Sequence, residues 1–489
     1  MKRFLQKRWL IILIICASLF LRLYKGQEWF TYTHDNDLTG WFIKDVVVNK
    51  HPRLVGQITS TPGFHIGPLF YYYQLPFYLL SKMDPIAGMW AVTLLGALST
   101  LSFWFVFTKV FGKKEGHIAA IVQAFSYYLI FNEREAVPTM PVILWTVWFL
   151  YSLQLLINGK KMGMVLLGLL VGLIWHLNVA LVLTLPAAAL AIFLSKKKIA
   201  KEGLINGLIL LIIFSLPLII FELRHNFPQV KALYLAFSTP QDDIISGYDK
   251  FQRVLLLLSK NVKTFLFSPS LGVSYFLALA TSIFGFAYLS LKKIISRNLS
   301  LVLSLWLVSF IVFFSMYSKV LSEYYLNGAL IIFICVLVLA ISSLLTSKYR
   351  ALGATFLAIY LLLNMIAFLR YSPSRNGYLE KKAIISAIDK DRLKFDYPCI
   401  SISYITDPGY DLGYRHFFFL RNMHVNHPDS GAPVYTIVFP LKDIFPTDEN
   451  FGALGLIHPD YSRYTKEGVI NSCSGQNSNL IDPMLGFTE

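Results

Sequence analysis

Two acidic side chains near the start of the chain have the type and spacing for catalysis. The motif YTHDND at 32–37 separates Asp35 from Asp37 by one residue and places His34 beside them. A carboxylate can accept the proton of an attacking nucleophile, or it can ligate a hard divalent cation. A solvated loop would carry the same pattern without either role. We therefore treat Asp35 and Asp37 as candidate catalytic groups and candidate metal ligands, with His34 as a neighbouring candidate.

A second acidic motif, NERE at 132–135, forms a short polar turn between two apolar runs. Short turns hold their side chains against neighbouring helix ends, so we expect Glu133 and Glu135 to approach Asp35. The alternative is that Arg134 pairs with a neighbouring acid. On the first interpretation, Glu133 and Glu135 are candidate catalytic or supporting carboxylates.

Cationic side chains lie at the ends of later apolar runs. Arg224 and His225 close one run, and Arg253, Lys260 and Lys263 lie on the amphipathic stretch RVLLLLSKNVKTFLF. Arginine binds phosphate in a bidentate manner, and lysine binds it as a point charge. These residues are candidate ligands of a lipid phosphate. Contact with lipid headgroups, without catalysis, would account for them as well.

Three further candidates interrupt apolar or aromatic segments. His176 and Asn178 break the apolar run 162–194, and Tyr72 lies in the aromatic segment HIGPLFYYYQLPFYLL at 65–80. A histidine among apolar residues is more often a packed, hydrogen-bonded group than a catalyst. Three later histidines lack the tight spacing of metal ligands, and these are His416, His424 and His427.

The composition indicates what must position these residues. The chain has 489 residues, of which 55% are hydrophobic and 15% charged, with a mean hydropathy of +0.56. A soluble domain carries roughly 25% charged residues, so a soluble enzyme, a disordered chain and a fibrous repeat are excluded. A membrane-crossing helix needs about 20 mostly apolar residues. We predict about eleven crossings, near 9–24, 85–108, 117–131, 138–157, 162–177, 178–194, 203–222, 271–291, 299–317, 325–346 and 351–371.

The charges predict the orientation of these helices. The chain has 44 Lys and Arg against 28 Asp and Glu, a net charge of +16. With a cytoplasmic N-terminus, the short inner segments carry this whole excess, as the positive-inside rule requires. The excess therefore indicates topology and contact with anionic lipid, and no nucleic-acid partner. The first apolar run could instead be a signal peptide, but it lacks an A-x-A cleavage site.

The predicted fold class is a mainly α, polytopic membrane protein with a small external α/β domain. Residues 1–371 form the membrane module, with external loops at 25–84 and 223–270, and residues 372–489 form the external domain. The helix-like YLEKKAIISAIDKD and the strand-like CISISYI and VYTIVFP predict its α/β character. Cys399 and Cys473 lie in this domain, where a disulfide and two free thiols are both open. No P-loop, GxGxxG, HExxH or GxSxG motif occurs.

The order of these segments resembles the C-type (GT-C) glycosyltransferases. It is most similar to bacterial members like the dolichyl-phosphate-mannose–protein mannosyltransferases and the lipid A aminoarabinose transferase. The resemblance covers about 9–370 and rests on HDNDLTGWFIKDVVVN, GPLFYYYQLPFYLL, GLLVGLIWHLNVALVLTLP and FELRHNFP. Where many relatives have an Asp or an Arg-Tyr pattern after the third crossing, this chain has NEREAVP. The resemblance therefore does not assign the second acid.

The resemblance implies an inverting transfer from a polyprenyl-phosphate-linked sugar to a lipid, protein or glycan acceptor. Asp35 matches the first-loop acid that acts as general base, and Asp37 neighbours it. Independently of the resemblance, eleven crossings with a cytoplasmic N-terminus put the C-terminus outside. We therefore expect a multi-pass protein of the plasma (inner) membrane whose C-terminal domain is external, or periplasmic. No cofactor is certain, and a divalent metal stays open because some relatives work without one.

Two other functions remain as alternatives, a lipid-linked substrate transporter or flippase and a polysaccharide ligase. Transporters often place charged groups near the bilayer midplane, whereas the ionisable groups here gather at the outer surface. A ligase would rely on outer arginines and histidine instead of an acidic first loop.

Overall fold

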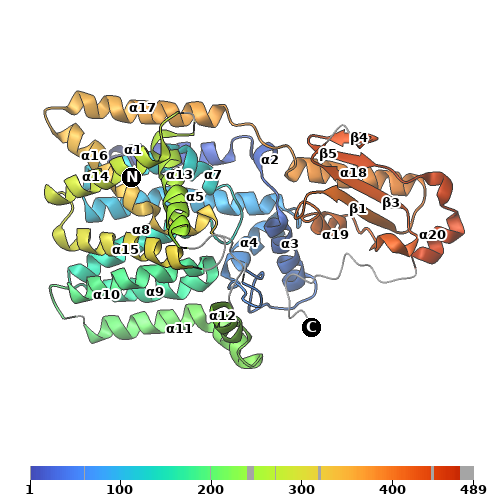
Figure 1. Ribbon diagram of the computed structural model, residues 1–489, viewed down its shortest axis with the longest axis horizontal. Coiled ribbons are helices and arrows are strands. Elements are labelled where there is room, and N and C mark those ends of the chain that lie inside the picture. Colours follow the sequence, from blue (N-terminus) through green and yellow to red (C-terminus); the bar gives the residue numbers. More distant parts are fainter. Residues whose placement is uncertain are drawn as a thin grey trace. The chain divides into compact units, whose positions relative to one another are not determined.

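The computed structural model describes residues 2–59, 61–198, 200–238, 247–269, 271–317, 321–441 and 445–473. Contacts within the chain divide it into two compact units (Figure 1). The first, here called the helical unit, comprises Met1–Tyr24, Val92–Arg134 and Pro138–Tyr371. The second, the mixed unit, comprises Lys25–Ala91, Glu135–Val137 and Ser372–Glu489. The segment predicted as the first external loop thus groups with the C-terminal residues.

The helical unit is built from helices at each of the eleven apolar stretches. Their bounds are α1 (Lys2–Leu23), α5 (Ile86–Val110, which begins in the mixed unit), α6 (Lys113–Phe125), α7 (Tyr127–Asn132), α8 (Val142–Ile157), α9 (Met162–Leu177), η1 (Val179–Thr184), α10 (Leu185–Phe193), α11 (Lys201–Arg224), α12 (Pro228–Ser238), α13 (Tyr248–Phe267), α14 (Tyr275–Leu291), α15 (Arg297–Met316), η2 (Glu323–Ala329), α16 (Leu330–Thr346) and α17 (Arg350–Leu369). The mainly helical class is confirmed.

Length and apolar composition separate these helices into two groups. Within the described residues, five helices are long and apolar enough to cross a membrane, at Ile86–Val110, Lys201–Arg224, Arg297–Met316, Glu323–Thr346 and Arg350–Leu369. Five shorter apolar helices accompany them, at Trp9–Leu23, Val142–Ile157, Met162–Leu177, Val179–Phe193 and Tyr275–Leu291. The number of eleven crossings stays a prediction.

The predicted interruption at 162–194 has a local cause. Asn178 adopts an extended backbone, with φ −160° and ψ 118°, which ends α9. Its side-chain oxygen then accepts a hydrogen bond from the Ala180 N–H at 3.0 Å, which starts the next helical turn. This is the usual role of asparagine at a helix N-cap.

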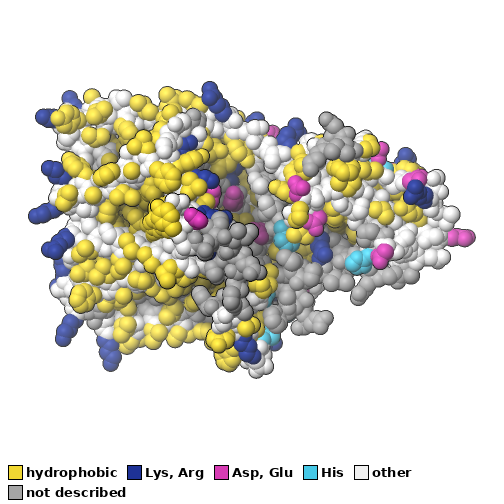
Figure 2. Space-filling model, in the orientation of Figure 1, with side chains coloured by type: hydrophobic (Ala, Val, Ile, Leu, Met, Phe, Trp, Pro, Cys, Tyr) yellow, Lys and Arg dark blue, Asp and Glu magenta, His cyan; other side chains and the backbone are white. Residues whose placement is uncertain are grey.

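The face of the helical unit seen in Figure 2 is mostly apolar. Figure 2 shows hydrophobic side chains over most of its visible face, with Lys and Arg gathered along the left edge. The connections α10–α11, α14–α15 and α16–α17 lie at that edge in Figure 1. One-sided placement of cations is the pattern that the sequence predicted for the inner loops.

The mixed unit combines first-loop helices with the C-terminal sheet. The loop contributes α2 (Gly26–Trp29), α3 (His34–Val47) and α4 (Leu69–Leu80). The C-terminal residues contribute α18 (Tyr378–Lys394), β1 (Ile400–Thr406), α19 (Arg415–Leu420), β2 (Val425–Asn426), η3 (Pro428–Ser430), β3 (Val434–Phe439), β4 (Glu449–Phe451), β5 (Leu454–Ile457), η4 (Tyr461–Arg463) and α20 (Lys466–Ser472). The predicted small sheet at the C-terminus is confirmed.

The sheet has the strand order β2-β1-β3-β5-β4. β1 and β3 pair in parallel from Ser401 opposite Val434 to Thr406 opposite Phe439, and β3 pairs antiparallel with β5. Cys399, just before β1, forms a disulfide with Cys473 at the end of α20, with a Cα–Cα distance of 5.5 Å. Of the two states left open for these cysteines, the structure has the disulfide.

Candidate active site

Helix α3 carries both acids of the first motif. Thr33 and Asn36 form a capping box at its start, with the Thr33 N–H donating to the Asn36 side-chain oxygen at 2.8 Å. Acidic residues in a first helical turn are favoured by the helix dipole. Successive helical residues turn by about 100°, so Asp35 and Asp37 point to different sides of α3. The spacing that suggested a joint metal site in a loop separates the two carboxylates on a helix.

Asp35 is half-buried and accepts a hydrogen bond from a neutral donor. The Gln57 side-chain N–H donates to Asp35 Oδ1 at 2.7 Å, and the side-chain oxygen of Gln57 accepts from the Tyr71 hydroxyl at 3.0 Å. Tyr71 is buried and stacks on Phe42 at 4.7 Å between ring centroids. Within the described residues, the second oxygen of Asp35 has no hydrogen-bond donor. Gln57, a loop residue, had no signal in the sequence.

Glu135 lies close enough to Asp35 for their charges to interact. Partial removal from water and the nearby Asp35 charge both raise the pKa of Glu135, although its side chain still reaches the surface. The adjacent backbone is tied to the same helix, because the Asn36 side-chain N–H donates to the Ala136 carbonyl at 2.9 Å. The structure therefore brings together one acid from each predicted motif.

Asp37 is buried and holds α3 to α19. Its Oδ1 accepts from the Tyr32 hydroxyl at 3.1 Å and from the His416 backbone N–H at 3.0 Å. The buried Lys381 lies near it, and burial lowers the pKa of that amine to about 8 while the Asp37 charge opposes the shift. Asp37 thus ties the first loop to the C-terminal residues. His34 is half-buried at the first position of α3.

Tyr72 fastens the loop between α3 and α4. Its hydroxyl accepts from the Arg53 N–H and donates to the Arg53 carbonyl, each at 2.9 Å. Arg53 in turn forms an ion pair with Asp45 at 2.8 Å. Tyr72 therefore supports the loop segment that carries Gln57.

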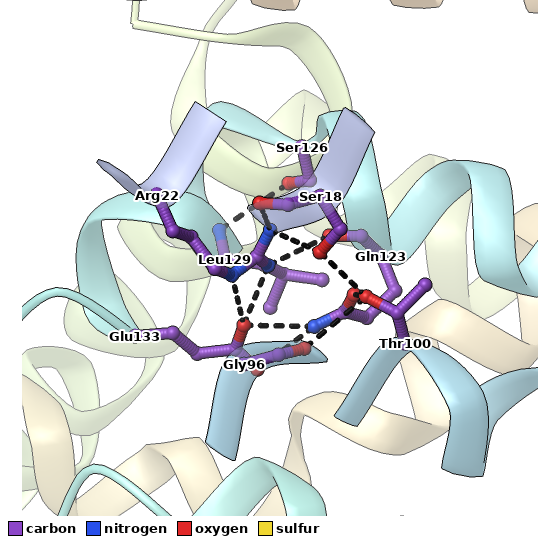
Figure 3. Close-up of polar contacts among 8 residues, drawn as sticks. All are labelled: Ser18, Arg22, Gly96, Thr100, Gln123, Ser126, Leu129 and Glu133. Carbon is purple, nitrogen blue, oxygen red and sulfur yellow. Dashed lines mark hydrogen bonds and ion pairs between the residues drawn. The ribbon is translucent and has the colours of Figure 1, made fainter. Parts of the chain in front are cut away.

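Glu133 is buried in the helical unit (Figure 3). Arg22 near the end of α1 donates to its Oε2 from Nε at 2.9 Å and from Nη2 at 2.5 Å. Arg134, which the sequence analysis considered as a partner for these acids, donates to the carbonyls of Leu21 at 3.4 Å and Tyr24 at 2.9 Å. Glu133 and Glu135, two residues apart, thus have opposite surroundings.

The candidate phosphate ligands form two groups in the helical unit. Arg224 is exposed at the end of α11, and the neighbouring His225 bonds through its ring nitrogen Nδ1 to the Phe221 carbonyl at 2.8 Å. The second group lies along α13, where Arg253 is half-buried and Lys260 stands 4.0 Å from Glu323. Lys263 is buried and donates to the Pro269 carbonyl at 3.1 Å.

His176 is a packed, hydrogen-bonded group. It is buried in α9, and its Nε2–H donates to the Phe214 carbonyl of α11 at 2.6 Å. Beside it, Asn178 caps the following turn. These contacts hold the helices together at the interruption.

Asp35 and Asp37, the pair predicted as metal ligands, do not share one site. In the part of the chain that the structure describes, no three His, Cys, Asp or Glu side chains converge as a metal site. Hard cations prefer carboxylate oxygens, and Asp35 and Glu135 are near enough for their charges to interact. Asp37 is engaged by Tyr32 and His416 instead.

Comparisons with known proteins show the fold. No protein-family model and no curated protein sequence matches the chain. ArnT from Cupriavidus metallidurans, solved with undecaprenyl phosphate bound, matches with a TM-score of 0.61 and 12% identity over 94% of this chain and 99% of that chain. Its apo state matches with a TM-score of 0.59 and 13% identity over the same shares.

A second solved protein has a more distant likeness. The apo oligosaccharyltransferase from Archaeoglobus fulgidus matches with a TM-score of 0.50 and 13% identity, over 88% of this chain and 69% of that chain. At these identities the likeness concerns the fold. The chain shares the fold of the ArnT structures, in agreement with the resemblance to the GT-C glycosyltransferases seen in its sequence. Its long apolar helices are those of an integral membrane protein.

Proposed function

We propose that the chain is a membrane glycosyltransferase that moves a sugar from a polyprenyl-phosphate-linked donor to an acceptor hydroxyl on the external face, with inversion. The observation that carries this proposal is the half-buried Asp35, oriented by Gln57 and set beside Glu135 on a GT-C fold. The undecaprenyl phosphate in the ArnT structure gives the donor class a precedent.

Asp35 acts as the general base in this proposal. The acceptor oxygen attacks the anomeric carbon of the sugar while its proton passes to the Asp35 carboxylate. The bond from that carbon to the phosphate oxygen breaks, and polyprenyl phosphate leaves with the electron pair. Attack opposite the leaving group inverts the anomeric configuration. One positioned base contributes about 10²–10⁴-fold to such a step.

The phosphate leaving group explains why one carboxylate suffices. Hydrolysis of a glycoside normally needs a second, protonated carboxyl to protonate the leaving oxygen. A sugar phosphodiester already has a stabilised leaving group, so cations can hold its charge instead. Arg224, His225, Arg253 and Lys260 are proposed for this task.

Glu135 would support Asp35 either directly or through a divalent cation. Like charges in one place favour a cation or a proton between them. If a cation binds here, Asp35 and Glu135 would hold it, and it would supply charge stabilisation. Asp37 is assigned to holding α3 in place.

The proposal includes a topology. About eleven crossings with a cytoplasmic N-terminus place the first loop and residues 372–489 outside the plasma (inner) membrane. The disulfide of Cys399 and Cys473 supports this side, because disulfides persist in oxidising compartments.

The test is transfer by the purified full-length protein from radiolabelled polyprenyl-phosphate hexoses and pentoses, with a cell-envelope fraction as acceptor. Asp35→Asn is expected to lower the rate by about 10²–10⁴-fold. Glu28→Gln, an exposed acid in the same loop that pairs with Lys25 at 3.7 Å, is the matched control and should keep its rate. Full turnover by Asp35→Asn would refute the base assignment, and no donor consumption by the wild type would refute the enzyme class.

A further inference from the structure

A buried ion pair lies in the helical unit outside the candidate active site. The Arg22 and Glu133 side chains are 0% and 2% exposed. Besides its two bonds from Arg22, Glu133 accepts from the Gln123 side-chain N–H at 2.8 Å on both oxygens. Figure 3 shows these three side chains converging from α1, α6 and the turn after α7.

A second layer of polar groups completes this network. Arg22 Nη1 donates to the Ser18 hydroxyl at 2.7 Å, and Ser18 and Thr100 share a hydrogen bond of 2.7 Å. The Thr100 hydroxyl also donates to the side-chain oxygen of Gln123. Gly96 leaves room for the guanidinium, since a methyl group there would overlap the Arg22 side chain. Both charged groups of the ion pair therefore have further hydrogen-bond partners in the surrounding side chains.

Such a network is costly for a membrane bundle. Burying two charges often stabilises less than well-packed apolar side chains of the same size would. Ionisable residues within transmembrane segments are therefore rare and usually serve a function.

The contacts form a reciprocal clamp, defined here as Arg22, Gln123, Glu133 and Arg134. Arg22 reaches from the end of α1 to Glu133 in the turn after α7. Arg134 reaches back from that turn to the last carbonyls of α1, at Leu21 and Tyr24. The end of α1 and the turn at 133–134 thus fix each other from both sides.

The clamp residues directly precede, along the chain, the two segments that carry the candidate carboxylates Glu135 and Asp35. The residue after Arg134 is Glu135, and the Ala136 carbonyl accepts from Asn36, next to Asp35. From the other side, α1 leads into the loop that carries Asp35. We infer that the clamp positions Glu135 opposite Asp35, with Glu133 and Arg22 as positioning residues. This inference rests on the proposed function.

The experiment compares Glu133→Gln with Glu115→Gln in the purified full-length protein. Glu115 is the matched control, because it lies in the first turn of the same helix α6 that carries Gln123 and bonds to Ser342 at 2.6 Å. For Glu133→Gln we expect kcat to fall at least 10-fold, with KM for a polyprenyl-phosphate sugar changed less than 2-fold. Glu115→Gln should keep its kcat at a similar thermal midpoint.

Hydrogen exchange provides a readout that does not need activity. Glu133→Gln should speed exchange of the backbone N–H groups at 133–137 by at least 10-fold, while Glu115→Gln leaves them unchanged. Wild-type kcat in Glu133→Gln, or an activity loss that only follows the loss of folded protein, would overturn the inference. If the wild type consumes no donor, the proposed function fails, and unchanged exchange at 133–137 would separately overturn the clamp.

Discussion

Two carboxylates in this chain, Glu133 and Asp35, have opposite surroundings. Glu133 is buried, accepts two hydrogen bonds on Oε2 from Nε and Nη2 of Arg22, and is further bonded by Gln123. Asp35 is half-buried, receives one neutral donor from Gln57, and has the like-charged Glu135 beside it. Glu133 is buried and bonded at both oxygens, so it has no access to an acceptor hydroxyl. A carboxylate with an unbonded oxygen can take up a proton.

The same division occurs within each short motif. In HDND, Asp37 is buried against Tyr32 and the backbone of His416, whereas Asp35 keeps an oxygen without a donor among the described residues. In NERE, Glu133 belongs to the clamp, whereas Glu135 reaches the surface. One acid of each motif is therefore engaged in structural contacts, and the other is the one that we propose for chemistry.

The largest effect on stability is expected when Glu133 loses its partner Arg22. Arg22→Met should destabilise the protein by about 3–5 kcal/mol, because removing one member of a buried ion pair strands the other charge. The measurement is the thermal midpoint of the full-length protein. Arg22→Met/Glu133→Leu should recover most of this loss, since no buried charge remains. A double variant as unstable as the single one would show that the ion pair is not the main cause.

The pH dependence of stability tests the burial of His416, the α19 residue whose backbone N–H bonds to Asp37 of α3. Burial lowers the pKa of His416 to about 4, and its Nε2–H donates to the Met83 carbonyl. The unfolded chain binds a proton near pH 6.5, so stability falls as the pH drops from 6.5 to 4, by roughly 3 kcal/mol at most. His416→Gln keeps a donor without this titration and should reduce the pH dependence of the thermal midpoint. The part that comes from His65 should remain, because burial also lowers the pKa of His65 to about 4. An equally steep dependence in His416→Gln would assign the effect to other groups.

The smallest expected effect is on kcat, and it tests whether Gln57 orients Asp35. Gln57→Leu removes the donor to Asp35, so we expect kcat to fall about 10-fold, equivalent to about 1.4 kcal/mol of barrier. The exposed Gln27 lies in the same loop, and Gln27→Leu is the matched control. Single-turnover transfer from a polyprenyl-phosphate sugar measures both. An equal loss in the two variants would mean that Gln57 does not orient the base.

The sequence predicted the positions of the helices well and their partners poorly. The apolar stretches coincide with helices because apolar length along the chain is a local property that lipid selects directly. The strands β1 and β3 were predicted from the strand-like segments CISISYI and VYTIVFP, whose composition is also a local property. Arg22 was missed as a functional residue, although a charge inside an apolar run is a signal that it must have a partner. Gln57 offered no comparable signal.

What the sequence determined by itself is the class of the protein, through its apolar runs, its basic excess and two short acidic motifs beside the ends of apolar runs. Which acid in each motif braces the fold and which remains open to a substrate was decided only by tertiary structure. The reason is that hydrogen bonds and ion pairs join residues about 20 to 380 positions apart, such as Asp35 with Gln57, Glu133 with Arg22, and Asp37 with His416. No local spacing encodes those pairings.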